Sequence, residues 1–417
     1  MANIQFSNGG RGQRFSSAMR SFFSSPWTVY GFGLVIAIAA SLIELLRGRA
    51  ENYMVFRDAT IDFWHLVNPY TDEFVQAHGR YYIYSPVFTL FFAPFAFVPR
   101  VLGGLLWNLV GYHVFFFAVR ALPSQISERS VPMLWFLLLF VAQSIFPFQY
   151  NVLVTCFFLL AFILLEADKP FWAVCIIMFC AVTKIYGIFE LALLLCYPKF
   201  WRNIGYAILW ALIFLALPVV RLGFDHFVEY YQYWFDMLSV HQVETGPYFS
   251  IPFAWPIGMF MMPYMRFLQA GSLAVLGIIF LCCYKRWSQL TFRVGALATL
   301  MGWIVLFSDV AEFTTYTIAV TGYALWYFSF PVTGNPSPVT PHHSPIDKVL
   351  FWSIFVLFGV MPIDLFCPSF ICRFVHLHLW IGVYVFAIAW IRILYTTLKN
   401  THPHRSLRYL SGGCLIY

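Results

Sequence analysis

The sequence predicts an all-α, polytopic integral membrane protein with about 10–12 transmembrane helices. Of its 417 residues, 61% are hydrophobic and only 10% are charged, whereas about a quarter of the residues in a soluble domain are charged. Mean hydropathy is +0.75, and several apolar runs approach the roughly 20 residues that cross a bilayer as a helix. This composition excludes a soluble enzyme, a disordered chain, a coiled coil and a nucleic-acid-binding protein.

Window length places the candidate spans in order along the chain. They cover residues 27–46, 86–99, 102–121, 131–147, 150–166, 170–197, 203–220, 268–284, 290–307, 314–331, 348–364 and 375–396. Two of these segments are ambiguous, because 86–99 is short and ends at Pro99, and 170–197 is long and interrupted by Lys184. Each of the two is either a span or a re-entrant segment.

Basic residues orient the chain, since Lys and Arg accumulate on the cytoplasmic side of membrane proteins. Basic clusters occur before residue 26, around Lys199 and Arg202, at 285–293 and after residue 397. The net charge of +7 is therefore an orientation signal, and both termini are expected in the cytoplasm. The predicted division is a basic amino terminus (1–26), one transmembrane module (27–396) and a basic tail (397–417), with outer loops at 47–85, 221–267 and 308–313.

The first outer loop is predicted to carry an amphipathic helix. Its apolar residues recur at helical spacing, at Val55, Phe56, Ala59, Phe63 and Leu66, and its polar side has Arg57, Asp58 and Asp62. One interpretation is an ordinary surface helix at the membrane interface. The other is catalytic: a carboxylate deprotonates an acceptor hydroxyl while the arginine holds an anionic leaving group.

Polar residues inside apolar segments are costly and therefore indicate function. Lys184 and Glu190 are the clearest, because their segment is otherwise apolar. Lys184 either acts in a site or extends to the lipid headgroups. Gln149 and Asn151, at the boundary between two spans, are either turn formers or polar ligands.

The other two outer loops also carry charged residues. In the last outer turn, Asp309 is suited to cap the following helix, whereas Glu312 lies about a turn deeper and is a candidate secondary acid. Arg221 begins the third outer loop, whose many Tyr and Trp residues we interpret mostly as the interfacial aromatic belt. No His or Cys pattern has the spacing of a metal site, so no cofactor is expected to be required. Binding of a divalent metal by the acids of the outer loops stays an open alternative.

Short motifs follow one another in a recognisable order. They are Phe56-Arg57 followed by Ala59, Asn68-Pro69-Tyr70, Tyr84-Ser85-Pro86, Ala93-Pro94-Phe95, Val98-Pro99, Leu106-Trp107-Asn108, Gln149-Tyr150-Asn151, Lys184-Ile185-Tyr186-Gly187, Tyr197-Pro198, and Ala311-Glu312 through Ala319-Val320. Over residues 26–395 their order and spacing resemble glycosyltransferase family 87, which comprises polyprenol-phosphate-mannose-dependent mannosyltransferases of the type C membrane fold.

The resemblance implies inverting transfer of a hexose from a lipid-phosphate sugar to an acceptor hydroxyl at the outer membrane face, with an acid of the first outer loop as base. The chain departs from the family at Asn52, where better-known members carry an aspartate. An amide cannot act as a carboxylate base. Either Glu51 or Asp58 has taken the role, or the base comes from another loop, with Glu312 the best remote candidate, or the chain binds without turnover.

The resulting prediction is a hexosyltransferase, expected to be a mannosyltransferase, in the inner (cytoplasmic) membrane with its site on the outer face. Its expected partners are a polyprenyl-phosphate-linked sugar donor, a glycolipid or glycan acceptor and membrane lipids. The candidate residues are Glu51 and Asp58 for catalysis, Arg57, Tyr84, Lys184, Arg221, Gln149 and Asn151 for donor binding, and Glu312 and Asp309 as acceptor-binding or secondary acids.

Two other functions stay open at this point. One is a carrier or flippase of lipid-linked sugars, and the other is a non-catalytic relative of the family. A flippase needs charges distributed along several spans, whereas here the acids gather in the outer loops, which favours an enzyme. Asn52 is the best support for a non-catalytic relative.

Overall fold

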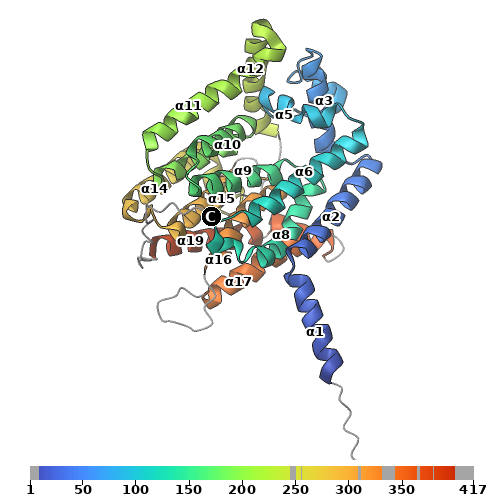
Figure 1. The fold of residues 1–417 in the computed structure, drawn as a ribbon. Helices are drawn as coiled ribbons and strands as arrows, with labels where there is room; N and C mark the ends of the chain where they lie inside the picture. The colour runs from blue at the N-terminus through green and yellow to red at the C-terminus, as the bar shows by residue number, and fades with distance from the viewer. Residues whose placement is uncertain are drawn as a thin grey trace, which may run out of the picture.

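The computed structural model describes residues 9–244, 250–254, 256–308, 311–330, 343–363, 367–378 and 380–399. Within these residues every regular element is a helix (Figure 1), so the predicted all-α class is confirmed. The first elements are α1 Gly9–Ser24, α2 Pro26–Leu46, α3 Glu51–Trp64, α4 Asp72–His78, α5 Pro86–Ala96, α6 Arg100–Arg120, α7 Ser124–Ser127, α8 Ser130–Ile145, α9 Asn151–Glu166, α10 Pro170–Thr183 and the 3-10 helix η1 Ile185–Cys196.

The remaining elements follow after residue 199. They are α11 Phe200–Ala216, α12 Val219–Glu244, η2 Ile251–Phe253, α13 Ile257–Met261, η3 Met262–Tyr264, α14 Met265–Cys282, η4 Tyr284–Arg286, α15 Leu290–Leu306, η5 Phe313–Thr315, α16 Tyr316–Phe328, α17 Pro345–Ile354, η6 Phe355–Val360, α18 Ser369–Arg373, η7 Phe374–His378 and α19 Ile381–Lys399. The predicted tail boundary at residue 397 thus falls in the last turn of α19.

Local sequence signals explain where several helices begin. Proline occupies the first turn of α2, α5, α10 and α17, where its missing N–H costs no hydrogen bond and its fixed φ suits a helix. At α17 the Ser344 side chain accepts a bond from the Asp347 N–H, and the Asp347 side chain accepts one from the Ser344 N–H. This capping box satisfies two N–H groups that would otherwise have no partner.

Four helices are long and apolar enough to cross a membrane: α2, α6, α14 and α19. A fifth candidate joins α11 to the first part of α12 across an 88° bend. Apolar side chains on α11 and α14, such as Leu212, Phe267 and Ile278, are exposed, as lipid-facing residues are. The class of polytopic membrane protein is therefore confirmed. The count of 10–12 spans stays a prediction, because the other apolar helices have 10–17 residues.

Neither ambiguous segment is one continuous spanning helix. Helix α5 has 11 residues, which at 1.5 Å each is about half the thickness of the bilayer core. In the longer segment α10 ends at Thr183, and Lys184 adopts the extended conformation (φ −146°, ψ 116°) before η1 begins. The segment thus consists of two half-helices joined at Lys184.

Helix α3 is amphipathic, as the sequence predicts, and packs against α5. The predicted apolar positions Val55, Phe56, Ala59 and Phe63 are buried. Leu66 is an exception, because α3 ends at Trp64 and Leu66 follows it with a φ of 62° and an exposed side chain. The helical spacing therefore applies only as far as Phe63.

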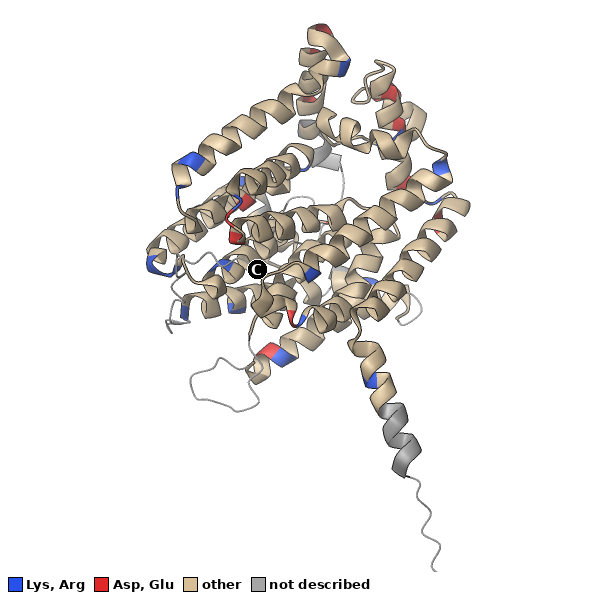
Figure 2. Ribbon diagram, viewed as in Figure 1, with Lys and Arg blue, Asp and Glu red and all other residues tan. Residues whose placement is uncertain are grey.

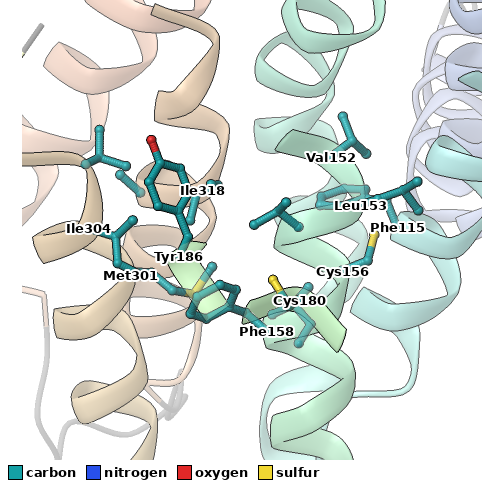
Figure 3. Close-up of a cluster of buried hydrophobic side chains, with 14 of the residues drawn as sticks. Phe115, Val152, Leu153, Cys156, Phe158, Cys180, Tyr186, Met301, Ile304 and Ile318 are labelled. Carbon is teal, nitrogen blue, oxygen red and sulfur yellow. The ribbon is translucent and has the colours of Figure 1, made fainter. Parts of the chain in front are cut away.

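The core lies where α9, α10, η1, α15 and α16 meet. Figure 3 shows part of it, with Cys156 and Phe158 from α9, Cys180 from α10, Tyr186 from η1 and Met301 from α15. Helices α15 and α16 pack closely on each other, and nearly all of their residues are buried. This central group of helices supports the loops that carry the polar residues described below.

Charged residues are unevenly distributed over the structure (Figure 2). Acidic residues of α3 and α12 lie at the top of the view, whereas basic residues lie at the left, at the beginning of α11 and just past the end of α14. The positive-inside rule predicts that the second end is cytoplasmic, and this orientation stays a prediction. We call these two ends of the molecule the acidic end and the basic end.

Candidate active site

Lys184 lies at the break between α10 and η1, and its ammonium group has a defined set of partners. Its Nζ donates a hydrogen bond of 2.7 Å to Asn151 Oδ1 at the start of α9. It also lies 4.9 Å from the centroid of the Tyr186 ring and 5.9 Å from that of the Tyr84 ring. A cation over aromatic faces is stabilised by the ring quadrupoles. The lysine is therefore held in place within the structure.

A chain of hydrogen bonds extends from Asn151 to an acid. Asn151 Nδ2 donates to Thr314 Oγ1 at 3.4 Å, and the Thr314 hydroxyl donates to Glu312 Oε2 at 3.3 Å. The same carboxylate oxygen accepts a bond of 2.9 Å from Gln149 Nε2. We call Gln149, Asn151, Lys184, Glu312 and Thr314 the lysine cluster. It joins three segments that are far apart in the sequence.

The turn between α8 and α9 places two members of this cluster. Phe148 has a left-handed backbone (φ 57°) and a fully buried ring, so it reverses the chain while it anchors the turn. Gln149 follows it, and Asn151 is the first residue of α9 and is buried. Asn151 begins α9, and its side chain accepts a bond from Lys184; its predicted role in donor binding stays a prediction.

A second group of ionisable residues lies on α3 and α4, and we call it the aspartate cluster. It comprises Arg57, Asp58, Asp62 and His78. The Asp58 carboxylate lies 3.6 Å from Arg57 Nη1 and 3.4 Å from His78 Nδ1, and the other ring nitrogen of His78 lies 3.8 Å from Asp62. One imidazole thus stands between two carboxylates that are one helical turn apart.

Burial raises the pKa of the Asp58 carboxyl above its usual value, and the positive charges of His78 and Arg57 oppose that shift. Burial likewise raises the pKa of Asp62, again opposed by His78. Arg57 has a further feature: its Nε is buried and has no hydrogen-bond partner among the described residues. A buried donor without a partner is costly, so this N–H is suited to bind an anionic ligand.

Aromatic rings connect the helix that carries Arg57, Asp58 and Asp62 to the lysine cluster. The Phe56 and Tyr84 rings meet edge to face, with their centroids 5.0 Å apart. The Tyr84 ring also faces the Lys184 ammonium. Asn52, where the resemblance predicts an aspartate, donates a bond of 2.7 Å to the Pro147 carbonyl. Helix α3 is thereby fixed to the turn that carries Gln149. Asn52 serves structure here, which is consistent with a base located elsewhere.

The other predicted site residues lie apart from these clusters. Glu51 is exposed and forms an ion pair with Arg80. Arg221 donates to the backbone carbonyl of Trp64, and its guanidinium lies 5.9 Å from the Trp64 ring, at the carboxyl end of α3. Asp309 lies outside the described residues. Their predicted roles stay predictions.

The sequence did not single out His78 or Thr314. His78 is the last residue of the short helix α4, and nothing in its spacing relates it to Asp58, twenty positions earlier. Thr314 is one of several hydroxyl residues just after Glu312. The useful signal for Thr314 is that a hydroxyl both donates and accepts, which allows it to connect an amide to a carboxylate.

No group of three or more His, Cys, Asp or Glu side chains is arranged to hold a metal ion in the part of the chain that the structure describes. What the two clusters offer instead is a lysine and an arginine beside carboxylates. Cations stabilise a departing anion, and a carboxylate accepts a proton from a hydroxyl. This pairing suits a group transfer with an anionic leaving group.

The fold and these clusters define a helical membrane protein with a polar site at one end. The model of glycosyltransferase family 87 matches residues 82–309, which is more than half of the chain. The chain therefore belongs to glycosyltransferase family 87 and is a glycosyltransferase. Neither the curated proteins nor the solved structures contain a match.

The matched residues include Tyr84, Gln149, Asn151 and Lys184, but they exclude α3 and Glu312. The resemblance over residues 26–395 is thus confirmed for its central part only. Because the aspartate cluster lies outside the match, its role depends on the geometry of this chain. The type C fold also stays a prediction.

Proposed function

We propose that the protein transfers a hexose, with mannose the expected sugar, from a polyprenyl-phosphate donor to a hydroxyl of a glycolipid or glycan acceptor at the outer membrane face. The reaction inverts the anomeric centre, because the acceptor oxygen displaces the lipid phosphate directly. The observation that carries the proposal is the lysine cluster, a cation held among aromatic rings beside a carboxylate network.

Lys184 is the proposed partner of the leaving phosphate. As the glycosidic bond breaks, negative charge grows on the phosphate oxygens, and a fixed cation stabilises that charge more than it stabilises the bound donor. Its bond to Asn151 and its position over Tyr186 hold the ammonium before the donor arrives. Arg57, with its unpartnered Nε, is the second candidate for this anion.

Asp58 is the proposed base. A base functions best when its pKa lies near the working pH, and burial raises the pKa of this carboxyl. Glu51 is less suited, because it is exposed and ion-paired with Arg80. His78 beside Asp58 orients the carboxylate and limits how far its pKa rises.

Glu312 is the alternative base. Its Oε2 already accepts bonds from Gln149 and Thr314, so this oxygen is occupied within the lysine cluster. This arrangement favours a role in holding the lysine cluster together over a role in accepting a proton.

The test is a transfer assay with purified protein in lipid vesicles and extracted acceptor glycolipids. The donors are radiolabelled polyprenyl-phosphate mannose, polyprenyl-phosphate glucose and a nucleotide-linked mannose. We expect label to reach the acceptor from a polyprenyl-phosphate sugar and not from the nucleotide sugar. Transfer from the nucleotide sugar alone would contradict the proposed donor. Movement of the lipid-linked sugar between leaflets without transfer would identify a carrier instead.

A further inference from the structure

A cavity of about 520 Å³ lies at the basic end of the molecule, where the turn between α9 and α10 meets the beginning of α11. It is separate from the residues of the candidate active site. Three cations line it, Lys169, Lys199 and Arg202, together with one acid, Asp168. None of these four forms an ion pair with another described residue. The cavity therefore has an excess of positive charge.

The backbone adds donors to these charges. Lys199 immediately precedes α11 and has a left-handed conformation (φ 60°, ψ 41°), and no side chain caps the helix at this end. The first N–H groups of a helix have no partner inside the helix and carry part of its positive dipole. The three cations around the same cavity are exposed and form no ion pair, so their combined charge also attracts an anion from the surroundings.

Aromatic rings form the rest of the cavity wall. The guanidinium of Arg202 lies 5.6 Å from the centroid of the Tyr206 ring, and the Trp172 side chain, which also lines the cavity, is exposed. Rings of this kind occur where a helix bundle meets the headgroup region of a bilayer, since they have an apolar body and a polar edge. The wall therefore suits a ligand that belongs to the membrane surface.

A neighbouring cavity provides a useful contrast. It has a volume of about 580 Å³ and shares Lys199 with the first. Its arginine, Arg293, is already neutralised by Glu166 through bonds of 2.6 and 2.7 Å. An anion is therefore expected to prefer the cavity whose cations are unpaired.

We propose that the cavity between the α9–α10 turn and the beginning of α11 binds a phosphate group. The group is supplied either by an anionic lipid headgroup or by free phosphate, and the aromatic wall favours the lipid. Basic pockets between helices on the cytoplasmic side are a recurrent setting for anionic headgroups. This site does not depend on the identity of the sugar donor.

The test measures binding to the full-length protein in detergent, by native mass spectrometry and by titration calorimetry. The probes are phosphatidylglycerol and phosphatidylcholine with eight-carbon chains, and inorganic phosphate. One variant, Lys169→Gln with Arg202→Gln, removes two charges from the cavity. A second, Lys199→Asn, removes the third charge but keeps a residue that tolerates the left-handed backbone. The control, Lys285→Gln with Lys348→Gln, removes two charges outside the cavity.

Phosphatidylglycerol is expected to bind at least tenfold more tightly than phosphatidylcholine. Each cavity variant should weaken that binding about fivefold or more, whereas the control should change it less than twofold. Inorganic phosphate that binds with equal affinity and the same sensitivity to the variants would support the phosphate site and assign its source to free phosphate. Absence of binding by both anions, or equal losses in the cavity and control variants, would overturn the proposal. Thermal melting of each variant shows whether it is folded.

Discussion

Lys184 is the residue on which the candidate active site depends most. The lysine lies at the break between α10 and η1. From there its Nζ donates a hydrogen bond of 2.7 Å to Asn151 Oδ1. The alternative of a lysine that merely extends to the headgroups is disfavoured by this bond and by the two rings beside the ammonium. A charge held in this way is available for the transition state without further reorganisation.

Lys184→Gln removes that charge and keeps a hydrogen-bond donor for Asn151. We expect kcat to fall by about 100-fold or more, the range seen when one group that stabilises a transition-state anion is lost, while KM changes little. Steady-state transfer kinetics measure both constants. Lys285→Gln is the matched control and should leave kcat unchanged. A rise in KM at constant kcat would show that the lysine binds the ground state and the transition state equally and does not lower the chemical barrier.

The pH dependence of transfer reports on Asp58. The base must be ionised, so kcat/KM should fall as the pH is lowered through the pKa of Asp58, which burial raises above the usual carboxyl range. Protonated His78 lowers that pKa. The substitution His78→Gln therefore raises the pKa of Asp58 further. The acid limb of the profile, where kcat/KM falls as the pH is lowered, should move to higher pH.

His65→Gln is the control for this profile, because His65 acts on Asp62 and is not among the groups that shift Asp58. Its acid limb should coincide with that of the wild type. A profile that is the same for wild type and His78→Gln would exclude Asp58 as the titrating base.

At the scale of elements, the close packing of η1 against α10 fixes the position of Lys184. A Cβ added to Gly187 would lie 2.4 Å from the backbone nitrogen of Ala181 and 2.7 Å from the carbonyl carbon of Cys180. Backbone atoms cannot move aside as a flexible side chain can. Only glycine therefore allows the half-helices to approach this closely just after the break.

Gly187→Ala should consequently displace η1, lower the Tm by several degrees and reduce transfer at least tenfold, because Lys184 moves with the break. Gly205→Ala, in α11, is the matched control, since nothing lies within 4 Å of its added Cβ. Thermal melting and the transfer assay measure both effects. Equal Tm values for the two variants would show that the packing of η1 is not required.

The sequence predicts much of the positions of the helices and their breaks, and less of the contacts in the candidate site. Helix α3 follows its apolar spacing as far as Phe63, and the break in the long segment coincides with Lys184, the residue that interrupts its apolar run. The bond between Gln149 and Glu312 joins residues 163 positions apart. Spacing carries no information about such a contact. The same is true of His78, whose relation to Asp58 arises only from the way α4 packs on α3.

At the scale of the whole molecule, an ion pair ties the centre of the bundle together at the basic end. Arg293 on α15 holds Glu166 at the end of α9 through two bonds, and the Tyr197 hydroxyl donates to the same carboxylate at 2.5 Å. Both charged side chains are largely buried. Loss of one partner would leave the other as an uncompensated charge that is largely buried.

Glu166→Gln should therefore destabilise the protein by about 3 kcal/mol, the low end of the cost of breaking a buried pair from one side. Thermal melting in detergent measures the change. Glu44→Gln is the control, because its partner Arg49 is 56% exposed and such pairs contribute little. A melting temperature of Glu166→Gln equal to that of the control would mean that water or lipid compensates the arginine.

We propose that this family 87 glycosyltransferase uses Asp58 as its base and Lys184 to hold the leaving phosphate. The most direct test compares transfer from polyprenyl-phosphate mannose by the wild type, Asp58→Asn, Glu51→Gln and Glu312→Gln, all shown to be folded. We predict that Asp58→Asn loses about 100-fold or more of kcat, that Glu51→Gln stays within about threefold, and that Glu312→Gln shows an intermediate loss without a change in the acid limb of the pH profile. Full activity in Asp58→Asn together with abolished activity in Glu312→Gln would contradict the claim and move the base to the lysine cluster.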